Sequence, residues 1–149
     1  MSNYDFLFDN DINLLDVVEE MNLLSINEMA IEAPESAKNL FEHMIKYKSN
    51  QIKQSSSWVK TIVRSCNELN GYINGKKKNV KQLNKNQLNT QYQEALHDAK
   101  KDNTILEDME TKPNDWTWEN ITNIEFLRTF MNTYYGPNPA MAFNVDELV

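Results

Sequence analysis

Apolar residues recur every three or four positions through most of the chain, which is the spacing that places side chains on one face of an α-helix. A first helix is predicted from a cap at Asp11 to Leu24, followed by a short helical turn that Ser25 and Glu28 can cap. Pro34 then predicts the start of a new helix, because proline fits a first turn, where its missing N–H is not needed. The pattern therefore predicts an all-α fold.

The most regular apolar repeat lies in the middle of the chain. On a heptad register, a single seam contains Phe41, Ile45, Ile52, Val59, Ile62, Cys66, Leu69 and Ile73. This repeat predicts one amphipathic helix over residues 41–73, or two helices in line. A break at residues 54–57 is the main alternative, because three successive serines form a helix poorly and Ser55 can cap a new start at Trp58.

Turn signals follow this repeat. The Asn-Gly pairs at residues 70–71 and 74–75 are expected to end the helix, because both pairs readily adopt positive φ. Residues 76–79 would then form an exposed basic turn, and a helix over residues 80–101 would fold back on residues 41–73. The sequence thus predicts a long helical hairpin.

A last helix is predicted beyond a linker. Asp115 or Thr117 can cap it, and Gly136-Pro137 can stop it. We expect a small helical bundle built on the hairpin, in which a single domain covers residues 1–149 and partly extended arms cover residues 1–10 and 137–149.

Composition supports this fold class. Three glycines and four prolines are too few for the frequent turns of an all-β domain. The chain has no apolar run long enough for a membrane span, and its acidic N-terminus is unlike a secretory signal. Cys66 is the single cysteine, which fits a reducing compartment. We therefore expect a cytoplasmic protein; its asparagine-rich composition favours a bacterial or phage source, in which case it would act in the host cytoplasm or virion.

Charge changes the picture more than composition does. Residues 1–42 carry ten acids and one base, a net charge of −9, and residues 87–149 carry eleven acids and four bases, a net charge of −7. Residues 43–86 carry ten bases and one acid, a net charge of +9. The acidic ends can fold back on the basic middle, or the middle can bind a polyanion or an acidic protein.

A nucleic-acid hypothesis follows from the basic block. On a continuous helix, Lys46, Lys53 and Lys60 would repeat every seven residues along one face, with Arg64 one turn beyond. Together with the lysines of the turn, the candidate phosphate contacts are Lys46, Lys53, Lys60, Arg64, Lys76, Lys77 and Lys78. Such stripes also occur on solvated helix faces, which remains the competing interpretation.

Residues for catalysis or metal binding are sparse. His43 and His97 lie far apart, with no partner at the spacing of a zinc site, and the glycines of a phosphate-binding loop are missing. Cys66 falls on the apolar seam, where a small buried side chain is more typical than a nucleophile. We expect no enzyme activity, no catalytic residue, no metal, no cofactor and no small-molecule substrate.

Both ends carry apolar residues in an acidic context. The segment Asp5-Phe6-Leu7-Phe8 resembles the short peptides by which bacterial and phage replication proteins bind a sliding clamp, although the glutamine usual ahead of that core is missing. Partner contacts are therefore expected from Phe6, Leu7 and Phe8, and from Met141, Phe143 and Leu148. Packing of these residues on the helices is the alternative.

These features predict a non-catalytic helical adaptor or assembly protein. It would self-associate through the seam residues Ile45, Ile52, Val59, Ile62 and Leu69, and bind protein partners through its ends. One alternative is a nucleic-acid-binding accessory protein, since the charge layout is similar to that of phage terminase small subunits and recombination mediators. A second alternative is an acidic inhibitor that mimics a polyanion and blocks a host nucleic-acid enzyme.

Overall fold

The computed structural model describes residues 33–106, 112–137, 139 and 142–149. This part of the chain is mostly helical, and its strands form one two-stranded sheet, so the all-α prediction is confirmed. The predicted first helix, the turn after it and the N-terminal arm lie outside the described residues. In the described part, no helix has both the length and the apolar character needed to cross a membrane.

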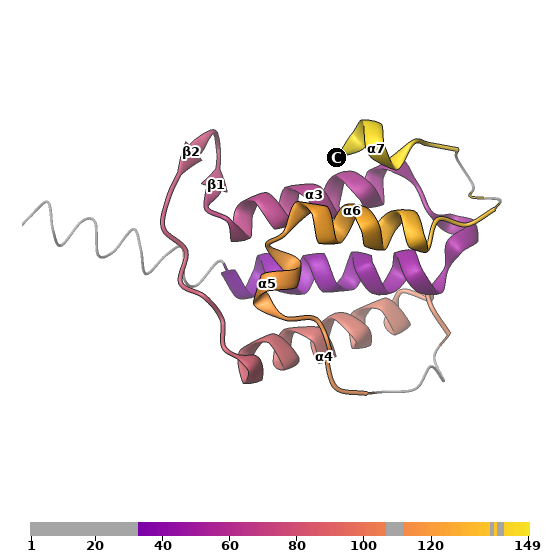
Figure 1. Ribbon diagram of the computed structural model, residues 1–149. Helices are drawn as coiled ribbons and strands as arrows, with labels where there is room; N and C mark the ends of the chain where they lie inside the picture. Colours follow the sequence, from indigo (N-terminus) through magenta and orange to yellow (C-terminus); the bar gives the residue numbers. More distant parts are fainter. Residues whose placement is uncertain (1–32, 107–111, 138, 140–141) are drawn as a thin grey trace, which may run out of the picture.

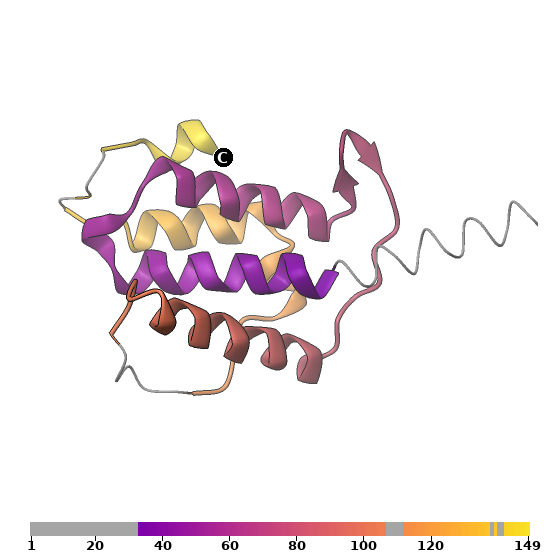
Figure 2. The ribbon, with the colours of Figure 1, turned by 180° about the vertical axis from the view of Figure 1, so that it is seen from behind.

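Four helices form the body of the molecule (Figures 1 and 2). The first covers residues 33–49 and is called the central helix, because the others surround it. The other elements are a 3-10 turn η1 (Gln51–Lys53), helices α3 (Ser56–Leu69), α4 (Lys85–Lys101), α5 (Trp118–Ile121), α6 (Ile124–Thr133) and α7 (Val145–Leu148), and strands β1 (Tyr72–Ile73) and β2 (Lys76–Lys77). Helix α3 runs antiparallel to the central helix, whereas α4 and α6 run in its direction.

The prediction of one helix over residues 41–73, or of two in line, is wrong. The chain leaves the central helix after residue 49, turns through η1 and reverses direction into α3. The break is therefore real, but it begins earlier than the serine run suggested. Ser55 caps α3 as expected, with its side chain accepting a hydrogen bond from the Trp58 backbone N–H.

The connection from α3 to α4 is a β-hairpin rather than a simple turn. Strand β1 pairs antiparallel with β2, and the central residues Asn74 (φ 52°) and Gly75 (φ 75°) both have positive φ, as a type I′ turn requires. Gly71 (φ 91°) extends the pairing, because its carbonyl oxygen accepts a 2.8 Å hydrogen bond from the Lys78 N–H. A Cβ on Gly71 would lie 1.9 Å from the Lys78 carbonyl oxygen, so only glycine fits there.

Helix α4 begins later than predicted, and the last helix is divided in two. A capping box between Asn84 and Gln87 starts α4 at Lys85 instead of residue 80. Thr117 caps α5 as predicted, and Asn123 then caps the separate helix α6.

One core joins the central helix to all its neighbours. Phe41 is fully buried; its ring stacks on Trp116 at 6.0 Å between centroids and meets Tyr92 of α4 edge-on at 5.7 Å. On the other side, the Tyr47 hydroxyl donates a 2.8 Å hydrogen bond to the Met131 carbonyl oxygen of α6. Of the seam residues, Ile45, Val59, Ile62, Cys66 and Leu69 are all buried within this single chain, whereas Ile52 is 71% exposed. The described seam is therefore core, apart from Ile52 and from Ile73, a partly exposed residue of β1.

Gln54 fastens the turn after the central helix to the end of α6. Its side chain is fully buried and donates 2.7 Å hydrogen bonds to the carbonyl oxygens of Tyr47 and Tyr134. Its Oε1 accepts a 2.9 Å bond from the Gly136 N–H. Gly136 also approaches Gln51 so closely that a Cβ there would lie 2.7 Å from the Gln51 Cβ.

The C-terminal tail is not simply an extended arm. Residues 145–148 form α7, which packs against α3 and α6 (Figure 1). Val145 is buried, and Phe143 and Leu148 are partly buried against the core. Phe143 also meets the Tyr135 ring at 5.0 Å between centroids. Phe143 and Leu148 thus pack in part on the helices, and their role as partner contacts stays a prediction, while Met141 lies outside the described residues.

Candidate functional site

The predicted basic stripe does not exist on one helix face. The turn at residues 50–55 places Lys46 on the central helix and Lys60 and Arg64 on α3. Lys46 is only 9% exposed, and its Nζ lies 2.8 Å from a carboxylate oxygen of Glu42. A buried, ion-paired lysine cannot meet a phosphate without losing that partner, so Lys46 is unsuited to the predicted role.

The other members of the stripe stay on the surface, Lys53 in η1 and Lys60 and Arg64 one turn apart on α3. Lys53 and Lys60 are exposed, and Arg64 is exposed but lies 4.0 Å from Glu68 one helical turn away. Two aromatic residues near these positions in the sequence contribute to the core: Tyr47 is fully buried, and Trp58 packs against the core residues.

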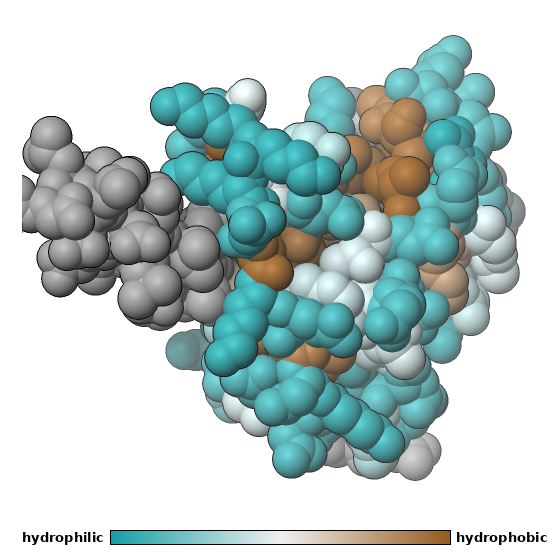
Figure 3. All heavy atoms as spheres, turned by 60° about the vertical axis from the view of Figure 1, so that its left-hand side comes forward, coloured by the Kyte–Doolittle hydropathy of each residue, from teal (hydrophilic) through white to brown (hydrophobic). Residues whose placement is uncertain are grey.

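The lysines after α3 follow one another along a single segment of the chain. Residues 76–85, here called the lysine segment, form β2, the chain that leads to α4 and the first residue of α4. All five of its lysines are exposed: Lys76, Lys77, Lys78, Lys81 and Lys85. The sequence has no acid between Glu68 and Glu94, so this segment carries a local charge of +5. Figure 3 turns this end of the molecule forward and shows a largely hydrophilic surface with smaller hydrophobic patches.

An exposed aromatic ring accompanies these lysines. Tyr72 of β1 is 52% exposed and pairs across the hairpin with Lys77. The Lys77 Nζ lies 4.8 Å from the centre of the Tyr72 ring and donates a 3.3 Å hydrogen bond to its hydroxyl. The hairpin therefore presents an ammonium group and a ring side by side.

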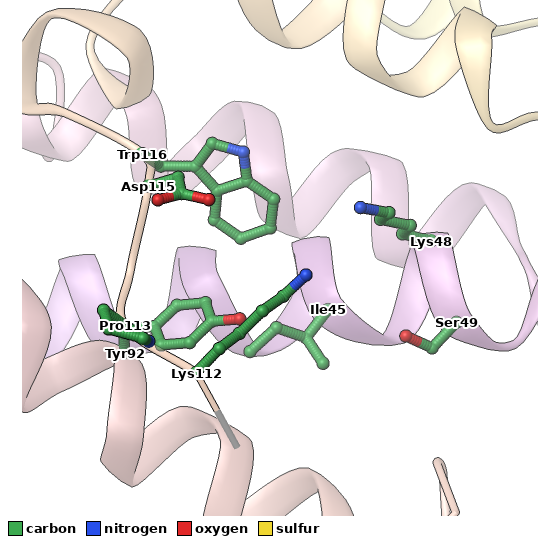
Figure 4. Close-up of a pocket in the computed structure, with 8 residues that line it drawn as sticks. All are labelled: Ile45, Lys48, Ser49, Tyr92, Lys112, Pro113, Asp115 and Trp116. Carbon is green, nitrogen blue, oxygen red and sulfur yellow. The ribbon is translucent and has the colours of Figure 1, made fainter. Parts of the chain in front are cut away.

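A pocket of about 280 Å³ lies between the central helix, α4 and the chain ahead of α5. Figure 4 shows the rings of Tyr92 and Trp116 on its walls and Ile45 behind them. Lys48 and Lys112 extend toward its middle from different segments, and the Asp115 carboxylate lies beside Trp116. The pocket thus combines two aromatic rings with two ammonium groups and one carboxylate.

A second hollow, of about 410 Å³, adjoins this pocket. Its walls are residues 82–85 with Leu88 on one side and residues 114–119 on the other. Asp115 and Trp116 line both hollows. The second hollow therefore shares Asp115 and Trp116 with the pocket and also borders the end of the lysine segment.

The titratable residues His43, Cys66 and Asp98 are held by burial, hydrogen bonds or ion pairs. Burial lowers the pKa of His43, whose Nδ1–H donates a 2.9 Å hydrogen bond to the Asn39 carbonyl oxygen. Burial also raises the pKa of the Cys66 thiol to about 11, so the thiolate that a nucleophile needs is scarce near neutral pH. The pKa of Asp98, next to His97, is lowered by its hydrogen bond to Lys38, whose Nζ lies 2.8 Å away. Among the described residues, no group of three His, Cys, Asp or Glu side chains could hold a metal ion.

Comparison with known proteins places the chain in a family. A family model described as "Domain of unknown function DUF29" matches residues 8–127. The chain belongs to the DUF29 family. No curated protein and no solved structure matches it.

The match covers the surface features of this DUF29 domain. The lysine segment, Tyr92 and Trp116 all lie within the matched residues, as do Phe8 and the first residues of α6. Phe6 and Leu7 lie outside them, and none of Phe6, Leu7 and Phe8 belongs to the described residues, so their predicted role as partner contacts stays a prediction.

Sequence reasoning missed the Trp116 pocket. Trp116 packs in the core against Phe41, Tyr92 and Phe130. A tryptophan can both fill a core and line a pocket, and only the tertiary arrangement shows where its exposed edge faces. A usable signal was the nearby run Lys112-Pro113-Asn114-Asp115, which was interpreted only as a linker.

Proposed function

We propose that this protein is a non-catalytic, nucleic-acid-binding accessory protein whose lysine segment contacts phosphates. The supporting observation is the concentration of five exposed lysines between Lys76 and Lys85, with no acid in the surrounding sequence from residue 69 to residue 93. Lysines that neutralise phosphates supply most of the sequence-independent affinity for nucleic acids. The net charge of the whole protein, −7, opposes the binding of a nucleic acid. The attraction must therefore come from this local group of lysines.

The shape of the hairpin strengthens this proposal. The pairing of Gly71 with Lys78 and the type I′ turn hold β2 in a defined position, so its lysines project from an ordered backbone. Tyr72 adds a ring on which a base can stack, as aromatic side chains do in single-strand-binding proteins.

A helical adaptor that binds a protein partner is the second candidate. Ile52 and Leu106 are large apolar residues with 71% and 73% of their surface exposed. Ile52 comes two residues after Asn50, and Leu106 two residues after Thr104. The Asn50 side chain donates a 2.7 Å hydrogen bond to the Thr104 carbonyl oxygen, at the end of the molecule opposite the hairpin. Exposed apolar residues at one end favour a protein contact there. In contrast, burial of most of the seam removes the reason to expect self-association through it.

A salt titration tests the leading proposal. Affinity for single-stranded and duplex oligonucleotides is measured by fluorescence anisotropy over a range of salt concentrations. The logarithm of the association constant should fall linearly with the logarithm of salt concentration. Changing Lys76, Lys77 and Lys78 together to alanine should reduce the slope by up to about three.

A charge-matched control removes three exposed lysines elsewhere, by changing Lys53, Lys60 and Lys101 to alanine. This variant should keep most of the slope if the lysine segment is the site. An equal loss in both variants would indicate a diffuse charge effect and contradict the proposed surface. Absence of binding at about 50 mM salt, where the electrostatic attraction is strong, would reject nucleic-acid binding and favour the adaptor.

A further inference from the structure

The Trp116 pocket has the size and the lining of a site for one unstacked base. Pockets for drug-sized ligands usually measure about 300–1,000 Å³, so a pocket of about 280 Å³ suits a smaller planar group. Its walls include the buried Tyr92 and the partly exposed Trp116, and stacking of a base on an aromatic ring such as that of Trp116 contributes about 1–3 kcal/mol.

The charged groups around the pocket favour a ligand that carries both an anion and hydrogen-bond donors. Lys48 and Lys112 are exposed, extend into the pocket and belong to no ion pair within the described part of the chain. The Lys48 Nζ also lies 5.1 Å from the centre of the Tyr134 ring. The Asp115 carboxylate offers a hydrogen-bond acceptor beside Trp116, which matches the N–H groups on the edge of a base. A nucleotide unit carries both a phosphate and such an edge.

The second hollow links this pocket to the lysine segment. Lys85 and its neighbours form one wall of that hollow, and Trp116 borders both hollows. A strand held by the lysine segment can therefore follow the surface into the pocket. The other wall carries the carboxylates of Asp115 and Glu119. Carboxylates can accept hydrogen bonds from the N–H groups of bases but repel phosphates, so the bases of the strand should face this wall.

We infer that the Trp116 pocket receives a base of a single-stranded nucleic acid, while Lys48 and Lys112 contact the adjoining phosphates. This inference rests on the proposed function and makes it specific for single strands. A duplex keeps its bases stacked and paired, and taking one out costs a few kcal/mol. A single strand offers unstacked bases without that cost.

The test compares three oligomers of about ten nucleotides, a length within the usual site sizes of single-strand-binding proteins. They are an oligothymidylate, a duplex of the same length, and a single strand of abasic sugar-phosphate units with the same charge. The wild-type protein should bind the oligothymidylate about tenfold more tightly than the abasic strand, because stacking of one base is lost. Changing Lys48 and Lys112 to alanine should weaken binding of the oligothymidylate more than the control changes Lys53→Ala and Lys101→Ala do.

A second measurement reports on the pocket directly. Changing Trp58 and Trp118 to phenylalanine leaves Trp116 as the only tryptophan, and stacking of a base should quench its fluorescence. The oligothymidylate should quench this emission and the abasic strand should not. If circular dichroism shows that this variant is unfolded, the comparison of oligomers on the wild-type protein decides by itself.

The outcomes separate this inference from the proposed function. Equal, salt-dependent affinity for the oligothymidylate and the abasic strand would overturn the base pocket and leave phosphate binding by the lysine segment in place. Tighter binding of the duplex would overturn it in the same way. Absence of binding by all three oligomers would instead reject the proposed function itself.

Discussion

Gln54 is the residue on which the turn after the central helix most depends. Its side chain satisfies the carbonyl oxygens of Tyr47 and Tyr134 and the Gly136 N–H, all within a region from which water is excluded. A buried polar group left without a partner costs about 1–3 kcal/mol. The change Gln54→Leu should therefore lower the free energy of unfolding by about 3 kcal/mol or more, as measured by urea denaturation.

The matched control is Gln82→Leu, which makes the same chemical change at an exposed position. Its effect should stay within about 0.5 kcal/mol. Equal effects of the two substitutions would contradict the role given to the hydrogen bonds of Gln54.

His43 makes stability depend on pH. Burial disfavours its charged form, the nearby charges of Lys46 and Arg64 act in the same direction, and the Asn39 bond and Glu42 oppose them. Because the pKa is lowered from 6.5 in the folded protein, the unfolded chain binds the proton first. The free energy of unfolding should therefore fall as pH decreases below 6.5 and on through the lowered pKa of the folded state. The change His43→Gln should remove this part of the dependence in urea titrations at several pH values; an unchanged profile would contradict it.

At the scale of elements, the sequence predicts two helix starts correctly, because an N-cap side chain bonds to backbone N–H groups only a few residues away. Ser55 and Thr117 cap the helices that they were expected to cap, because an N-cap needs only a short polar side chain near free N–H groups. The β-hairpin was missed although its signal was local as well. The Asn74-Gly75 pair was interpreted as a helix stop, whereas a two-residue loop between Tyr72-Ile73 and Lys76-Lys77 is a strong hairpin signal.

The break after the central helix could not be placed from periodicity. Two antiparallel helices that face each other need the same apolar spacing as one long helix, so the heptad register continues through the turn. The bonds that fix the turn join residues far apart in sequence, such as Gln54 and Tyr134. Periodicity contains no information about such pairs, and the stripe built on a continuous helix was wrong for the same reason.

At the scale of the whole molecule, the seam serves the fold of one chain. Ile52 is its exposed member, so the change Ile52→Lys should alter the free energy of unfolding by no more than about 0.5 kcal/mol. Light scattering should give the same mass for the variant and the wild type. The contrasting change Val59→Lys places a charge in the core and should unfold the protein.

A variant Ile52→Lys that dissociates a wild-type oligomer would contradict this expectation and identify the exposed end as an interface between copies. Melting temperature and scattering mass, measured on the same samples, separate the two results.

Across the whole molecule, some lysines form ion pairs and others are exposed to solvent. In the described part, Lys38 and Lys46 on the central helix are paired with Asp98 and Glu42, while the lysines between β2 and α4 are exposed without acidic neighbours in sequence. Within the basic middle of the chain, Lys46 is thus held in an ion pair inside the bundle, whereas the lysine segment is exposed at one end and Lys48, Lys53 and Lys60 are exposed elsewhere.

The hydrogen bonds that close the bundle also order the events of folding. Tyr47 and Gln54 meet residues 131–136, more than 75 positions later in the chain. Contacts at such separations form slowly, because a long loop must close before they stabilise anything. A chain emerging from the ribosome can form α3, the hairpin and α4 while these two side chains still lack their partners. Helix α6 arrives late, followed by α7, which packs against α3 and α6. Until α6 docks, the apolar side chains that it covers in the folded protein stay exposed.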